Sequence, residues 1–242
     1  MRLMSYNIHG GVGTDGIHDY ARIGDFLQQR QVDVALLQEF DTRPRSRITQ
    51  DDIDALCGRH FRWLLPSPTV VGPYGWYGNA ILTRYPATYT GTVDTSQHGF
   101  ESRNIQEAIL RTPQGPLHVI NTHNGLNRIE RRAQIHLLST HLRQRPALDI
   151  PLVVAGDFNE WQLFSRAFTR VDRLLHPQPA GKTFPTRLPL FRLDRAWCKP
   201  RELVQAIQVV KTPLTRYLSD HYPLELELAL PAWPLRRGRC SR

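Results

Sequence analysis

The chain has 242 residues, of which 40% are hydrophobic, so it is long enough to bury a full core in one or two domains. Lysine and arginine number 31 against 22 acidic residues, and the resulting net charge of +9 favours a polyanionic substrate or surface. The three cysteines are odd in number and show no CxxC spacing, which argues against a disulfide framework and against a zinc site.

The domain organisation follows from the spread of polar motifs along the chain. They run from residue 7 to residue 221 without a linker-like tract, so residues 1–230 should form one domain. Residues 231–242, which are rich in arginine, should form a disordered basic tail. No apolar run approaches a membrane span, and the first predicted strand leaves no room for a signal peptide. We therefore expect a cytoplasmic protein, and nothing indicates an obligate protein partner.

Strand and helix patterns alternate in the first half of the chain. A strand at residues 2–5 precedes a helix over residues 19–30, which Asp19 caps, and a buried strand at residues 32–38. A second helix passes through Ala55 and Leu56. Short strands are then expected at residues 62–65, 79–83, 87–93, 105–111 and 117–122.

The second half begins with the clearest helix, over residues 127–145, which Asn127 caps and Pro146 ends. A buried strand follows around Val153, then a short helix and a proline-rich loop over residues 176–190. Three strands close the chain, at residues 193–198, 203–210 and 222–230. So many strands with few helices predict two packed sheets whose outer faces are covered by helices.

Polar clusters lie at the ends of five of these strands. The most informative is Gly156-Asp157-Phe158-Asn159, in which a carboxylate and an amide two residues apart can both face a crevice. Alone, this pattern is also ordinary turn chemistry, so its weight depends on the other clusters. They are Tyr6-Asn7, Gln38-Glu39, Asn121-Thr122-His123 and Ser219-Asp220-His221.

Seven residues of these clusters are candidates for the chemistry, namely three carboxylates, two amides and two imidazoles: Glu39, Asp157, Asp220, Asn7, Asn159, His123 and His221. Oxygen ligands without cysteine suit Mg²⁺ or Mn²⁺ better than zinc. Histidines beside such an ion could hydrogen-bond a phosphate and move protons near neutral pH. Although each residue alone is more often a turn, surface or packing residue, the set favours phosphoester hydrolysis by metal-activated water.

An ordered series of motifs links the chain to a known family. The motifs are Ser5-Tyr6-Asn7-Ile8, Leu37-Gln38-Glu39, Gly78-Asn79-Ala80-Ile81-Leu82, Asn121-Thr122-His123, Gly156-Asp157-Phe158-Asn159, Leu193-Asp194-Arg195 and Ser219-Asp220-His221-Tyr222-Pro223. With them the chain resembles the endonuclease/exonuclease/phosphatase superfamily, whose fold is deoxyribonuclease-I-like, over residues 2–230, and short bacterial members most of all. The resemblance implies an α/β fold: a four-layered α/β sandwich in which two mixed, mostly antiparallel sheets pack face to face with helices outside.

The resemblance also implies roles for the site residues. Glu39 would be the principal metal ligand, with Asn7 and Asp220 close by. Asp157 would orient or deprotonate the attacking water, and Asn159 would hold it or a phosphate oxygen. His221, its ring fixed by Asp194, would stabilise phosphoryl charge, and His123 would contact the phosphate or help the leaving group. Substrate contacts are expected from Asn79, Arg103, Arg195, Trp76 and Tyr77.

Three functions remain open, and the first is slightly favoured. A nuclease or nucleic-acid phosphodiesterase would place arginines against the phosphate backbone of DNA or RNA and aromatic rings against bases. A phosphodiesterase for phospholipid head groups or small phosphoesters would turn the same arginines toward an anionic membrane surface or a compact substrate. An inactive binding module is opposed by the intact residue set. The arginines concerned are Arg43, Arg45, Arg47, Arg187, Arg192 and Arg195.

Overall fold

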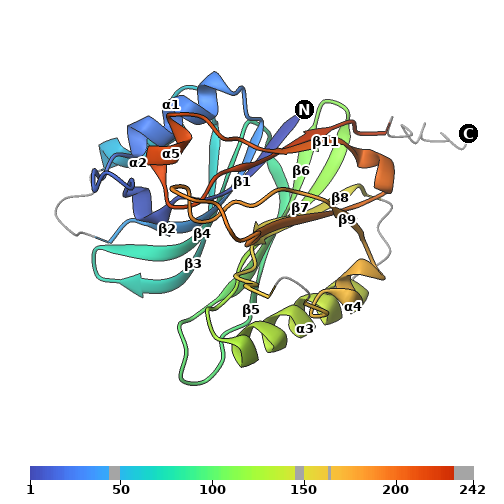
Figure 1. Cartoon of the computed structure of the whole chain (residues 1–242). Coiled ribbons are helices and arrows are strands. Elements are labelled where there is room, and N and C mark those ends of the chain that lie inside the picture. The colour runs from blue at the N-terminus through green and yellow to red at the C-terminus, as the bar shows by residue number, and fades with distance from the viewer. Residues whose placement is uncertain (44–49, 145–149, 163–164, 232–242) are drawn as a thin grey trace, which may run out of the picture.

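Two six-stranded sheets form the centre of the molecule (Figure 1). The computed structural model describes residues 1–43, 50–144, 150–162 and 165–231, so Arg45, Arg47 and nearly all of the predicted basic tail lie outside the described residues. The first sheet has the strand order β11-β12-β1-β2-β4-β3 and the second has the order β5-β6-β7-β8-β10-β9. Only the central pairs β1–β2 and β7–β8 are parallel, so both sheets are mixed and mostly antiparallel, as predicted.

The bounds of most strands lie within a few residues of the predicted ones. The first sheet is built from β1 (Arg2–Asn7), β2 (Val34–Asp41), β3 (Trp63–Gly72), β4 (Gly75–Thr83), β11 (Val204–Val209) and β12 (Leu224–Leu228). The second is built from β5 (Ala87–Asp94), β6 (Asn104–Thr112), β7 (Gly115–His123), β8 (Leu152–Asp157), β9 (His176–Gln178) and β10 (Asp194–Lys199). The helices are α1 (Tyr20–Gln29), α2 (Gln50–Cys57), α3 (Arg128–Gln144), α4 (Thr169–Asp172) and α5 (Thr215–Leu218), with 3-10 turns at His9–Gly11 and Arg201–Leu203.

Three hydrophobic clusters separate four layers, which are helices, the first sheet, the second sheet and helices again. One lies between the sheets and joins Leu3 and Ile81 of the first sheet to Val119 and Ala155 of the second. Another packs the outer face of the first sheet against α1 and α2, and the last packs the outer face of the second sheet against α3 and α4. Because both faces of the central strands are buried, these strands appear in the sequence as nearly continuous apolar runs.

Local signals account for the two long helices. The side chain of Asp19 accepts a hydrogen bond from the backbone N–H of Arg22 at 3.2 Å, so the predicted cap of α1 is confirmed. Asn127 likewise accepts from the backbone N–H of Ile129 at 2.8 Å at the start of α3. No helix in the described ranges is both long and apolar enough to cross a bilayer.

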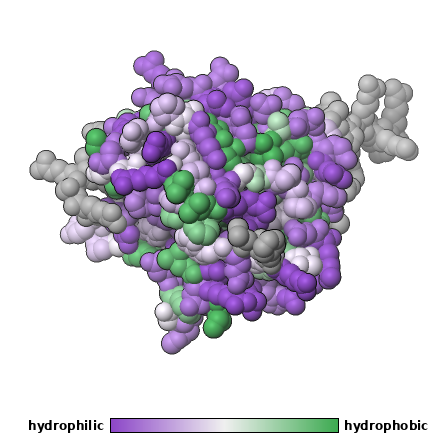
Figure 2. Space-filling model, in the orientation of Figure 1, coloured by the Kyte–Doolittle hydropathy of each residue, from purple (hydrophilic) through white to green (hydrophobic). Residues whose placement is uncertain are grey.

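Two predictions of local structure were wrong. The strand expected at residues 62–65 continues through Pro66 and Pro68 to Gly72, because β3 is the edge strand of its sheet and proline there removes no ladder hydrogen bond. The proline-rich loop contains β9, a three-residue edge strand paired with β10. On the face shown in Figure 2, hydrophilic residues cover most of the surface.

Candidate active site

The ends of the two parallel strand pairs bring four of the predicted side chains together. Asn7 is the last residue of β1, His123 the last of β7 and Asp157 the last of β8. Glu39 lies inside β2, where the register with β4 shifts between Leu37 and Phe40. Glu39 adopts φ +56° there, a left-handed conformation that is uncommon outside glycine and is typical of functional sites.

Oδ2 of Asp157 is the atom on which the site converges. It accepts a hydrogen bond from Nδ2 of Asn7 at 3.0 Å, and the same amide donates to Oε1 of Glu39 at 2.9 Å. Nε2 of His123 and Nε2 of His221 each lie 3.6 Å from Oδ2. Burial is the main cause that raises the pKa of Asp157, to about 6, against the lowering effect of His221.

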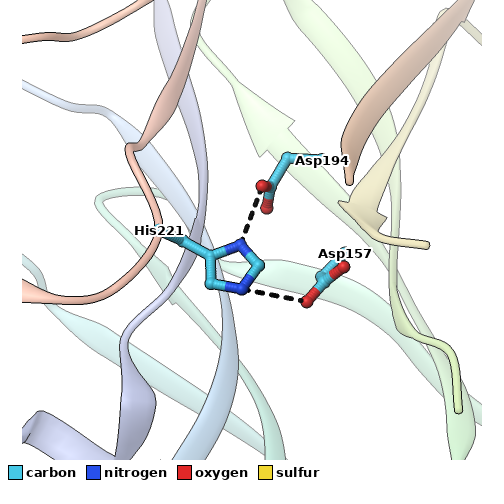
Figure 3. A group of neighbouring side chains, drawn as sticks. All are labelled: Asp157, Asp194 and His221. Carbon is cyan, nitrogen blue, oxygen red and sulfur yellow. Dashed lines mark hydrogen bonds and ion pairs between the residues drawn. The ribbon is translucent and has the colours of Figure 1, made fainter. Parts of the chain in front are cut away.

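The ring of His221 lies between two carboxylates (Figure 3). Its Nδ1 is 2.9 Å from Oδ2 of Asp194, as predicted across 27 positions of sequence, and its Nε2 faces Asp157. Burial would lower the pKa of His221, but Asp194 and then Asp157 outweigh burial and raise it to about 10. His221 is therefore an imidazolium at neutral pH, with Nδ1–H donated to Asp194.

His123 is held in the opposite charge state. Burial, then the positive charges of Arg103 and His221, bring the pKa of His123 well below its ordinary value, so its imidazole is neutral. Nδ2 of Asn159 donates to the backbone oxygen of Asn124 at 2.8 Å and lies 3.2 Å from Nε2 of His123. The two histidines thus differ in charge although both face Asp157.

The chain around Asp157 is fixed by tight local packing. A Cβ on Gly156 would lie 2.0 Å from the backbone oxygen of Thr122, so only glycine permits this approach of β8 to β7. Phe158 is fully buried and packs edge-on against Phe168 and Trp197. Asn159 then turns to φ +50°, and its backbone N–H donates to Oδ1 of Asp157 at 2.9 Å.

The donor set fits a hard divalent cation on the Glu39 side of the site. The side chain of Glu39 is 25% exposed, whereas that of Asp157 is 1% exposed, so only the former opens toward solvent. The ligand atoms of Asp157, Asp194 and His221 also lie within 4.8 Å of one another. Nδ1 of His221 is already hydrogen-bonded to Oδ2 of Asp194, however, so two of these three side chains are paired with each other and suit the orientation of a proton or phosphate donor.

A family model described as the Endonuclease/Exonuclease/phosphatase family matches residues 4–221. The chain belongs to the endonuclease/exonuclease/phosphatase family. Members of this family are hydrolases that act on phosphoesters and are typically metal-dependent. The matched region includes Asn7, Glu39, Asp157 and His221.

Several known proteins are similar to this chain in sequence or in fold. The uncharacterized protein YbhP of Escherichia coli strain K12 is 35% identical over 173 residues, and the match covers 66% of each chain, just under two thirds of YbhP. The mannosyl-6-phosphatase Bt3783 of Bacteroides thetaiotaomicron superposes with a TM-score of 0.77 at 18% identity, over 95% of this chain and 100% of that one. D. rerio TDP2 complexed with single strand DNA product superposes with a TM-score of 0.69 at 17% identity, over 93% of this chain and 97% of that one.

Two of the predicted substrate-binding residues lie near the site, and two others are used in packing or in joining the sheets. Tyr77 lies beside Glu39 in a hollow of about 260 Å³, and Arg103 is buried near Tyr77 and His123. Asn79 is buried and donates to Oδ1 of Asn104 at 2.9 Å, so it links the two sheets. Trp76 stacks on Phe40 with ring centroids 4.9 Å apart, which makes it a packing residue.

Arg195 lies outside the site, and Asp220 lies at its margin. The guanidinium of Arg195 lies 4.5 Å from the ring centroid of Phe168 on the outer face of the second sheet, away from His221. Asp220 is half-buried, and its Oδ1 lies 3.3 Å from Oγ of Ser219. Its charge is the least of the causes that raise the pKa of His221.

Sequence reasoning missed two groups that hold the site in place. Oγ of Ser219 donates to the backbone oxygen of Asn7 at 2.8 Å and ties the His221 loop to the end of β1. Ser219 lies in a recognised motif, so its position could have been noticed. The backbone oxygen of Asn124, which fixes Asn159, carries no side-chain signal and could not have been found from sequence.

Proposed function

We propose that this family member is a divalent-metal-dependent phosphodiesterase that hydrolyses a phosphodiester with metal-activated water, with nucleic acid as the favoured substrate. The observation that supports it best is the convergence on Oδ2 of Asp157. A carboxylate whose pKa is raised to about 6 can accept a proton near neutral pH, and two histidines in opposite charge states flank it.

Each residue then has a chemical task. The carboxylate of Glu39, oriented by the amide N–H of Asn7, would hold Mg²⁺ or Mn²⁺, and the bound ion would neutralise charge on the phosphoryl group and activate the attacking water. Asp157 takes the proton of the attacking water as its oxygen bonds to phosphorus. Asn159 positions that water, because its own amide is fixed by the carbonyl of Asn124.

The two histidines act on the phosphoryl group and the leaving group. His221 presents Nε2–H to a phosphoryl oxygen, while Asp194 keeps its ring oriented and charged. Neutral His123 lies beside Arg103, and both can contact phosphate oxygens as the phosphorus–oxygen ester bond breaks. The departing oxygen takes its proton from solvent or from a neighbouring N–H.

Two observations favour nucleic acid over smaller phosphoesters. The excess of positive charge suits a polyanion. Tyr77, with the guanidinium of Arg43 4.8 Å from its ring centroid, offers a stacking surface beside Glu39. The small volume of the Glu39 hollow, about 260 Å³, instead favours a compact phosphoester, which makes that class the second candidate.

A substrate panel with a salt titration tests the proposal. Hydrolysis of single-stranded DNA, RNA, small phosphodiesters and phospholipids is measured with Mg²⁺ and with EDTA, and we expect nucleic acid hydrolysis that EDTA abolishes. The affinity of the Asp157→Asn variant for an oligonucleotide should fall as salt is added. The slope of log affinity against log salt concentration should be about −0.7 for each neutralised phosphate. Adding Arg187→Ala to this variant should make the slope shallower. Full activity in EDTA overturns the metal mechanism. A salt-independent affinity overturns the nucleic acid assignment in favour of a compact phosphoester.

A further inference from the structure

A hollow of about 360 Å³ between α3 and α4 is lined by positive charge. Arg132 and His136 enter it from α3, and Arg166, Arg170 and Arg173 enter it from α4 and its flanking residues. All five are exposed, and no carboxylate contributes to the lining among the described residues. The hollow lies on the outer face of the second sheet, where α3 and α4 pack (Figure 1), and belongs to neither the strand-end site nor the Glu39 hollow.

The four arginines of this hollow differ from many others in the molecule, because they have no acidic partner among the residues that the structure describes. Arg30, Arg43 and Arg84 form ion pairs with carboxylates at 2.6 to 2.8 Å. In the ranges that the structure describes, none of the four arginines of the α3–α4 hollow forms an ion pair. Four cations that share one hollow repel one another, and a multiply charged anion would relieve that repulsion.

One of the cations is already oriented by a neighbour. Nη1 of Arg170 lies 2.7 Å from Nδ1 of His136. Since arginine stays protonated, it donates and the histidine accepts, which leaves the other N–H groups of Arg170 for a ligand. Guanidinium groups present paired donors that match phosphate oxygens.

The positive charge continues on the other side of α4. A second hollow of about 500 Å³ is lined by Arg192, Arg195 and Arg201, and α4 with its flanking residues contributes to both hollows. Two acids also line this second hollow, and both have other partners: Asp172 accepts a hydrogen bond from Nε1 of Trp197 at 2.7 Å, and Asp194 contacts His221. Burial, and after it the charge of Arg192, lower the pKa of Arg195 to about 10.

We infer that the α3–α4 hollow is a second anion site that binds the phosphate groups of a ligand carrying several of them, apart from the reacting centre. Such phosphates can come from the backbone of a nucleic acid or from a free polyphosphate. The extension of positive charge across α4 fits a ligand with more than one phosphate, because a single phosphate would engage only part of the lining.

Binding measured in EDTA tests this site without any turnover, so the result is independent of the proposed catalytic function. The probes are a fluorescein-labelled single-stranded oligonucleotide, followed by anisotropy across a salt series, and pyrophosphate, followed by thermal melting. Arg166→Ala/Arg170→Ala is compared with Arg59→Ala/Arg111→Ala, which removes two exposed arginines elsewhere. Arg132→Ala/Arg173→Ala replaces the first variant if that variant fails to fold by circular dichroism.

We expect the hollow variant Arg166→Ala/Arg170→Ala to bind the oligonucleotide about tenfold more weakly than the wild type. Its slope of log affinity against log salt concentration should be shallower by about 0.7 for each phosphate that is no longer neutralised. The control should match the wild type. If only pyrophosphate raises the melting temperature of wild type and control but not of the hollow variant, the site takes free polyphosphate. Equally weakened binding in the hollow and control variants overturns the inference, as does the absence of any response to either probe.

Discussion

Asp194→Asn tests whether one buried hydrogen bond sets the charge of His221. The rise in the pKa of His221 from 6.5 to about 10 corresponds to about 5 kcal/mol in favour of the imidazolium. Asp194 contributes most among the groups that raise it, so a neutral amide at this position should lower the pKa by about 2. Activity that needs protonated His221 should then decline at a correspondingly lower pH. At pH 9 the loss should be about tenfold relative to the wild type, and near pH 6.5 it should be small.

The free energy of unfolding of metal-free Asp194→Asn should also depend on the charge of His221. A raised pKa in the folded state gives stability that is complete below 6.5 and is lost as the pH rises through about 10. Asp194→Asn should therefore be destabilised at pH 7 and much less so above pH 10.

The assay combines a pH profile of kcat/KM on a chromogenic phosphodiester with ¹⁵N NMR titration of His221. Asp94→Asn, at an exposed acid far along the chain, serves as the matched control. A variant whose alkaline limb and NMR titration coincide with those of the wild type would refute the reasoning.

Three further substitutions test other parts of the site. Glu39→Gln should abolish both Mg²⁺-dependent hydrolysis and the rise in melting temperature that Mg²⁺ causes, and a retained Mg²⁺ response would remove Glu39 from the metal site. Asp157→Asn should be inactive. In the absence of metal it should be more stable than the wild type at pH 8 but not at pH 4. The reason is that the raised pKa of Asp157 makes its ionised form unfavourable in the folded protein above about pH 6. Gly156→Ala should lose more than about 2 kcal/mol in urea unfolding, whereas Gly72→Ala, whose Cβ meets its nearest atom at 3.5 Å, should lose far less.

Much of the fold could be predicted because its physical causes are local. Buried strands appear as apolar runs, and the caps Asp19 and Asn127 mark where the helices begin. The limits of β3 and the existence of β9 depend instead on which strands lie at a sheet edge. That is a property of the assembled sheet, and proline in a segment is as typical of a loop as of an edge strand.

Strand alternation explains which neighbouring site residues the structure separates. Successive side chains of a strand point to opposite faces, so the adjacent pair Asp194 and Arg195 cannot both reach His221. Trp76 and Tyr77 are likewise adjacent on β4, and only Tyr77 faces the Glu39 hollow. Alternation applied to these two adjacent pairs would have excluded one member of each.

Glu39 shows where this rule stops being sufficient. Leu37 and Phe40 both pack into the outer cluster of the first sheet, although three positions apart should place them on opposite faces. The register shift between them adds one residue to β2 opposite β4, and Glu39, at φ +56°, occupies it. Regular alternation would have aimed residue 39 at the outer face, with Leu37. The irregularity instead brings its carboxylate to the amide of Asn7, so the position of the proposed metal ligand depends on a local departure from strand geometry that side-chain identity alone does not encode.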